Sequence, residues 1–202
     1  MSVPDLATWC ASLADGFGGL RLAYTWAFLE AIILPLPPEI LLIPLALAAP
    51  ERGVTLAVAA VCGSLSGGLV SFLTGWRWNE RVVAILKRLP GVNPDRVLWA
   101  SLMVRRLGSR FIAVSPWLVL PYKITSVVSG TLHLTWWRYL LAGAVGRGTR
   151  LLSIAWVAAM LGARCAVCVQ THAIAAVLLT YAAVGAGVWL IQRWLLQCVG
   201  RW

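Results

Sequence analysis

Six charged side chains lie inside or beside strongly apolar segments of this 202-residue chain, where an isolated charge is unfavourable. No acid follows Asp95, so the bases of the second half need a counter-charge from the first half or from an anionic ligand. Guanidinium groups bind phosphate through two-point contacts. The pattern therefore predicts a binding site for a phosphate headgroup, with four basic residues as its ligands: Arg110, Lys123, Arg147 and Arg150.

The two acids of this set are Glu30 and Glu39. Removal of a carboxyl group from water favours its neutral form, whereas a neighbouring cation favours its charged form. Either acid could therefore exchange a proton near neutral pH, and we expect both to take part in proton coupling. A structural alternative remains open, in which Glu39 pairs with Lys123 or with an arginine and only holds two segments together.

Prolines interrupt the two segments that must position these residues. The first segment, over residues 30–50, reads EAIILPLPPE followed by ILLIPLALAAP. The second, over residues 110–131, begins RFIAVSPWLVLPYK. A proline-broken helix leaves backbone groups unpaired, and lipid cannot pair them. We therefore expect both segments to fold back as re-entrant hairpins inside the protein, an arrangement that marks binding sites in transporters.

Composition indicates an integral membrane protein of the all-α class. The chain is 60% hydrophobic and 12% charged, with a mean hydropathy of +0.83, and a soluble domain of this size could not bury that much apolar surface. We expect a single membrane domain over residues 1–202, with about four transmembrane helices besides the hairpins. Its other predicted parts are an interfacial helix over 1–16, a helix over 17–34, spans over 53–75, 135–161 and 173–195, and an amphipathic loop over 76–109 with helices near 80–89 and 97–107.

The net charge of +10 is explained by membrane orientation rather than by nucleic-acid binding. Eight of the seventeen Lys and Arg residues fall between Arg77 and Arg110, a stretch whose only acids are Glu80 and Asp95. Cytoplasmic loops are enriched in Lys and Arg. The loop 76–109 is therefore expected in the cytoplasm together with the C-terminus. The two hairpins would then enter the membrane from opposite faces, as an inverted pseudo-repeat.

At these residues the sequence resembles the DedA family of membrane proteins, which carries the SNARE-associated or VTT domain. It looks closest to the branch with a Pro-Tyr/Phe-Lys second hairpin and a Gly-Arg-Gly-x-Arg span. The matching features lie between about residues 25 and 162: Glu30 with the PLPPE stretch, GSLSGGLVSFLTGW, SRFIAVSPWLVLPYKITSVVSG and WRYLLAGAVGRGTR.

The resemblance implies opposed hairpins in the bacterial inner membrane and a flippase that moves undecaprenyl phosphate or a phospholipid, coupled to a proton or cation gradient. It assigns the family's hairpin acids to Glu30 and Glu39, and its second-hairpin bases to Arg110 and Lys123. The better-known flippase branch has two arginines close to one proline, whereas Arg110 and Lys123 are thirteen residues apart. The identity of the lipid therefore stays open, as does the choice between a monomer and a homodimer.

Two other classes of function compete with lipid translocation. A structural or partner-recruiting membrane protein would use its buried charges only to pair with one another. A membrane enzyme acting on lipid phosphates needs a nucleophile and an acid–base group, but His133 and His172 lie far apart without an acid nearby. We expect no enzymatic activity, no metal site and no cofactor. The CxxC motif of Cys165 and Cys168 is interpreted as a structural disulfide or as two free thiols.

Overall fold

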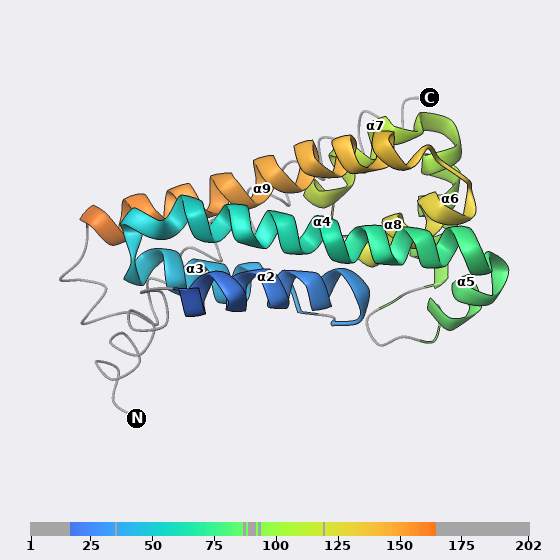
Figure 1. Ribbon diagram of the computed structural model, residues 1–202. Helices are drawn as coiled ribbons and strands as arrows, with labels where there is room; N and C mark the ends of the chain where they lie inside the picture. The colour runs from blue at the N-terminus through green and yellow to red at the C-terminus, as the bar shows by residue number, and fades with distance from the viewer. Residues whose placement is uncertain are drawn as a thin grey trace.

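A computed structural model describes residues 17–34, 36–86, 88, 92, 94–118 and 120–164. The predicted interfacial helix 1–16, the predicted span 173–195 and the CxxC motif lie outside these residues. The described part is all-helical, without a strand, which confirms the predicted all-α class. Its helices are, in order, α2 (Phe17–Ile32), α3 (Glu39–Ala48), η1 (Pro50–Arg52), α4 (Gly53–Trp78), α5 (Glu80–Leu86), α6 (Pro94–Leu107), α7 (Ser109–Val114), η2 (Ser115–Trp117), α8 (Tyr122–Thr131) and α9 (Trp136–Arg164) (Figure 1).

The prolines end helices where the sequence predicts breaks. Helix α2 ends at Ile32, and α3 starts at Glu39, directly after Pro37 and Pro38. The second segment divides in the same manner into α7, η2 and α8, with an extended stretch before Pro121. Proline has no N–H to continue a helix, which explains both interruptions. Pro44 lies inside α3, and the helix continues past it.

The two longest helices, α4 and α9, lie side by side along the molecule and run in opposite directions (Figure 1). Near one end, a Cβ atom added to Gly53 of α4 would lie 3.0 Å from the side chain of Ala159 in α9. Near the other end, the rings of Phe72 and Tyr139 stack with their centroids 4.7 Å apart. These two helices form the frame on which the broken segments pack.

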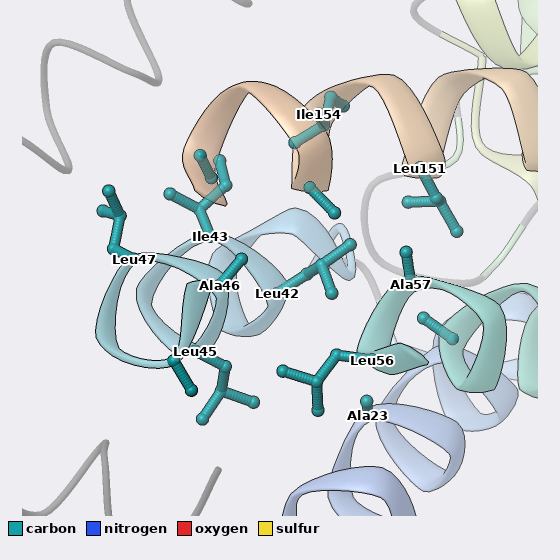
Figure 2. Close-up of a cluster of buried hydrophobic side chains, with 14 of the residues drawn as sticks. Ala23, Leu42, Ile43, Leu45, Ala46, Leu47, Leu56, Ala57, Leu151 and Ile154 are labelled. Carbon is teal, nitrogen blue, oxygen red and sulfur yellow. The ribbon is translucent and has the colours of Figure 1, made fainter. Parts of the chain in front are cut away.

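The first broken segment contacts both long helices. Helix α2 runs parallel to α4, because Gly63 and Gly67 of α4 abut the backbone at Tyr24 and Phe28 respectively. After the break, α3 packs against α9, where Gly162 leaves room for the backbone of α3. Apolar side chains fill the space between α2, α3, α4 and α9 (Figure 2): Ala23, Leu42, Ile43, Leu45, Ala46, Leu47, Leu56, Ala57, Leu151 and Ile154.

The second broken segment makes the reciprocal set of contacts. Its first limb, α7, packs on α9, where Gly146 abuts the backbone of Ala113. Its second limb, α8, packs on α4, where Gly75 abuts the backbone of Val127. Each first limb therefore lies on the long helix that follows it in sequence, and each second limb lies on the long helix of the other half. Glycines let these helix backbones approach one another closely.

Among the described residues, one helical stretch is long and apolar enough to cross a membrane by length and composition, Pro50–Trp78. It comprises η1 and α4, has 29 residues and contains the predicted span 53–75. Helix α9 covers the predicted span 135–161 and has sufficient length, but it carries four arginines: Arg138, Arg147, Arg150 and Arg164. The membrane topology of the other segments stays a prediction.

Candidate functional site

The two proline breaks meet around one pocket of about 330 Å³. The first break contributes Leu34 and Pro37 to its wall, and the second contributes Pro116, Leu118, Leu120 and Pro121. Charged side chains from five helices complete the lining, with Tyr122 between them: Glu30, Glu39, Arg96, Lys123, Arg147 and Arg150. Segments far apart in sequence therefore line one pocket, with charged side chains in its wall, at the points where their helices are interrupted.

Arg147 and Arg150 lie on one face of α9, as their three-residue spacing predicts. Arg147 pairs with Glu30 of α2 through a nitrogen–oxygen contact between Nη2 and Oε2. Arg150 pairs with Glu39 at the start of α3, with Nη2 2.9 Å from Oε1. A single face of α9 thus pairs with an acid on each side of the first break.

Four of the charged side chains in the pocket are buried, so each needs a partner that compensates its charge. Exposed fractions are 8% for Glu30, 3% for Glu39, 3% for Arg147 and 2% for Lys123. Removal of charged groups from water is costly unless each finds a partner of opposite charge or a polar group. The carboxylate of Glu39 is also placed at the N-terminus of α3, where the helix dipole favours negative charge.

At the breaks, two basic side chains donate hydrogen bonds to backbone carbonyl oxygens. Lys123 donates a hydrogen bond of 2.9 Å from Nζ to the carbonyl oxygen of Ile33, just past the end of α2. Arg150 donates from Nη1 to the carbonyl oxygen of Pro116 in η2. The last carbonyls of a helix lack partners within it, so these two bases satisfy backbone groups that the prolines leave open.

Several buried polar atoms in the pocket have no hydrogen-bond partner among the described residues. They include both carboxylate oxygens of Glu39 and the Nε atoms of Arg147 and Arg150. The Glu39–Arg150 contact is close enough for an ion pair, but its angles do not make it a hydrogen bond. Native proteins seldom leave such groups unsatisfied. A ligand or water molecule in the pocket would satisfy them.

Positive charge exceeds negative charge in the lining. Two carboxylates, Glu30 and Glu39, lie in this lining with four basic side chains: Arg96, Lys123, Arg147 and Arg150. The pocket is therefore suited to an anionic group. Among the described residues, no cluster of three His, Cys, Asp or Glu side chains could hold a metal ion.

Five of the six residues expected at the site converge on this pocket, and Arg110 does not. Arg110 lies near the start of α7, is exposed and is absent from the pocket lining. The remaining four residues of α7 separate it from the break that the other bases surround. The prediction that Arg110 binds a headgroup together with the other bases is therefore not supported by this geometry.

The sequence did not predict two polar residues of the lining, Arg96 and Tyr122. Arg96 of α6 was grouped with the solvated charges of the cytoplasmic loop, but it reaches the pocket although it is exposed. The signal was its place directly before Val97, the first of the inward-facing residues of α6. Tyr122 was seen only as part of a motif, yet its ring lies against the guanidinium of Arg147, 4.4 Å from Cζ to the ring centroid.

Comparison with known proteins gives a relative of undefined role. The chain is 26% identical over 145 residues to a protein of Haemophilus influenzae described as uncharacterized. The match covers 69% of this chain and 73% of the relative. No family model matches the chain. No solved structure matches it either.

Proposed function

We propose that this chain is a multi-pass protein of the bacterial inner membrane that moves lipids with an anionic headgroup between leaflets. The observation that carries the proposal is the meeting of both proline breaks around one charged pocket. Interrupted helices are compatible with a membrane interior where they are enclosed by protein or line a polar cavity. The resemblance to the DedA family leads to the same reaction class, with undecaprenyl phosphate or a phospholipid as the substrate.

The outer faces of α4 and α9 support a location in lipid. Large apolar side chains are exposed along both helices, whereas Arg147 and Arg150 of α9 line the pocket. Large exposed apolar patches on soluble monomers are rare, and they often mark contact with a membrane or a protein partner. The exposed apolar residues are Val54, Val58, Val70 and Leu73 on α4, and Leu141, Val145, Trp156 and Met160 on α9.

Tryptophans mark one end of this apolar surface. Trp76 and Trp78 close α4, and Trp136 and Trp137 open α9. All four are exposed, and the antiparallel arrangement of the two helices brings them to the same end of the molecule. Tryptophan is enriched where a membrane meets water. This end would therefore lie at a membrane surface, next to the basic loop that is expected in the cytoplasm.

The reciprocal packing of the broken segments supports two opposed re-entrant hairpins. Each half consists of a broken segment followed by a long helix, and the long helices run in opposite directions. Such halves would be related as an inverted repeat, with the binding site at their interface. Their breaks meet at the pocket, which is where a transported group would be expected.

In the proposed mechanism, the ion pairs hold the empty pocket and the headgroup replaces them. An anionic headgroup would compete with Glu30 for Arg147 and with Glu39 for Arg150. Protonation of either acid would release its arginine to the headgroup, which couples lipid binding to proton uptake. Arginine suits this role because it binds phosphate through two parallel contacts.

Reconstitution into liposomes with leaflet-specific labelled lipids tests the proposal. We expect wild-type protein to exchange a phosphate-bearing lipid, and Arg150→Gln to slow that exchange about tenfold or more, because a charge-assisted contact is lost. Arg110→Gln is the matched control, since Arg110 lies outside the pocket, and it should exchange lipid at close to the wild-type rate. Exchange that is absent with wild type, or equally affected by both substitutions, would reject the pocket as a translocation site.

Proton coupling needs a separate measurement. Lipid exchange is compared with and without an imposed pH gradient for wild type and for Glu39→Gln. We expect the gradient to change the rate for wild type and to have little effect on the variant, whose amide cannot take up a proton. An unchanged response in the variant would remove Glu39 from the coupling step.

A second candidate, a structural membrane protein, is favoured by the pairing of both acids with arginines and of Lys123 with a backbone carbonyl. In that case the charged pocket only joins the two halves. The liposome experiment separates the candidates. A structural protein would remain folded in the membrane and exchange no lipid, whereas a lipid-phosphate enzyme would release a product.

A further inference from the structure

Tyr122, the first residue of α8, places its ring against the guanidinium of Arg147 inside the pocket. The distance from Cζ to the ring centroid is 4.4 Å, and both residues are buried. A cation is attracted to the face of an aromatic ring, most strongly where water is absent. Arg147 is thus held by a carboxylate from α2 and by an aromatic face from α8.

The ring of Tyr122 is held by stacking on Tyr139 and by one hydrogen bond of its hydroxyl group. Its hydroxyl oxygen lies 3.0 Å from that of Tyr139, which in turn lies 2.7 Å from the hydroxyl oxygen of Ser126. The rings of Tyr122 and Tyr139 also stack, with 18° between their planes. A buried, connected group of this kind restricts the ring to one position.

Two glycines provide the space that the ring occupies. A Cβ atom at Gly68 of α4 would lie 2.5 Å from Cε1 of Tyr122, and one at Gly143 of α9 would lie 2.6 Å from its hydroxyl oxygen. Gly63 and Gly146 of the same helices adjoin the backbone of a neighbouring segment. The close neighbour of Gly68 and Gly143 is instead a side chain of the pocket, Tyr122.

We propose that Tyr122 is a positioning residue whose ring keeps the guanidinium of Arg147 oriented on Glu30 and in the pocket. A long arginine side chain would otherwise lose conformational freedom each time an anion binds, and pre-organisation avoids that loss. The inference deepens the function proposed above and depends on it only for the identity of the anion. The ring contact itself can be tested without any lipid transport.

The test uses NMR on protein whose arginines are labelled with ¹⁵N, in phosphatidylcholine nanodiscs. The Nε–H resonance of Arg147, assigned with Arg147→Lys, should be shifted upfield by the ring current of Tyr122. Inorganic phosphate is then titrated while this resonance is followed. The variants are Tyr122→Phe, which keeps the ring, Tyr122→Leu, which removes it, and Tyr24→Leu, a control outside the pocket.

We expect Tyr122→Phe and Tyr24→Leu to keep the upfield resonance and to bind phosphate within about twofold of wild type. Tyr122→Leu should return the resonance to the ordinary arginine range and weaken phosphate binding about tenfold or more. A resonance that stays in place in Tyr122→Leu overturns the proposal. If the resonance moves in Tyr122→Leu but phosphate perturbs it in no variant, wild type included, the positioning role stands and the anion site fails.

A second pair of variants serves if Tyr122→Leu does not fold. Gly143→Ala directs a methyl group at the Tyr122 hydroxyl and should displace the ring, with the same loss of the upfield shift. The double variant Gly143→Ala, Tyr122→Phe removes that hydroxyl and should restore the resonance. Loss of the shift that is not restored in the double variant would also overturn the proposal.

Discussion

The ammonium group of Lys123 donates a 2.9 Å hydrogen bond to the carbonyl oxygen of Ile33, so the second broken segment caps the helix that leads into the first break. The two residues are 90 positions apart in sequence. A cation at a helix C-terminus also interacts favourably with the helix dipole. This bond ties a side chain of the second half to the backbone of the first half.

Replacement of Lys123 by methionine should therefore destabilise the protein. The apolar chain fills a similar volume but leaves the Ile33 carbonyl without its partner, at a cost of about 1–3 kcal/mol. Denaturant unfolding in detergent measures the change in the free energy of unfolding. Arg110→Met, at an exposed position, is the control and should change stability by less than about 0.5 kcal/mol. Equal effects of the two substitutions would contradict the capping role of Lys123.

The pair of Glu30 and Arg147 should behave as a strongly coupled unit. Either Glu30→Gln or Arg147→Met alone leaves one buried charge without its partner, which costs about 3–5 kcal/mol. The double variant should lose clearly less stability than the sum of the single variants. A double-mutant cycle by denaturant unfolding measures this coupling, with the exposed Arg138 as the control partner for Glu30. Additive losses for Glu30 and Arg147 would show that the two residues act independently.

Two glycines of α9, two positions apart, provide a matched test of how α7 packs. A Cβ atom at Gly146 would meet the backbone of Ala113, whereas one at Gly148 has nothing within 4 Å. We expect Gly146→Ala to destabilise the protein by about 1–3 kcal/mol through overpacking. Gly148→Ala should be neutral or stabilising by up to about 1 kcal/mol, because alanine favours helix. Thermal unfolding in detergent of both variants checks this, and a neutral Gly146→Ala would place α7 elsewhere.

Lipid exposure of α9 can be tested with spin labels in a cysteine-free background. Labels at Val145 and Trp156, both exposed and apolar, should be relaxed by oxygen, which concentrates in the bilayer, more than by a water-soluble nickel complex. A label at Glu51, exposed in η1 at the start of the apolar stretch, should show the opposite preference. Nickel accessibility at Val145 equal to that at Glu51 would argue against a membrane location for α9.

The sequence predicted the elements of this fold better than the pairs of residues that connect them. The expected span 53–75 begins at the first residue of α4, since an apolar run bounded by prolines and arginines defines a helix locally. Convergence of Lys123, Arg147 and Arg150 on the two acids followed from charge balance alone. Which acid pairs with which arginine depends on the rotation of α9 against α2 and α3, and that rotation is set by packing between distant segments.

The sequence did not place Arg110, Arg96 and Tyr122 correctly relative to the pocket, and the physical reason is the same for all three: their positions depend on how distant segments pack. Arg110 and Lys123 both flank the second broken segment, but only Lys123 faces the pocket, because the chain turns at Pro116 and Pro121 between them. Arg96 is one of several bases in an amphipathic loop, and only the docking of α6 distinguishes it from its neighbours. The role of Tyr122 depends on the fold, which places its ring against Arg147 and next to Gly68 and Gly143.

The packing of α3 on α9 has a consequence for biosynthesis. Helix α3 is synthesised before α4 to α8, and its partner helix α9 is synthesised only after them. Until then Glu39 has no Arg150 to pair with. A nascent chain that stops before Trp136 therefore contains every part of the first half and yet lacks the surface on which that half is completed.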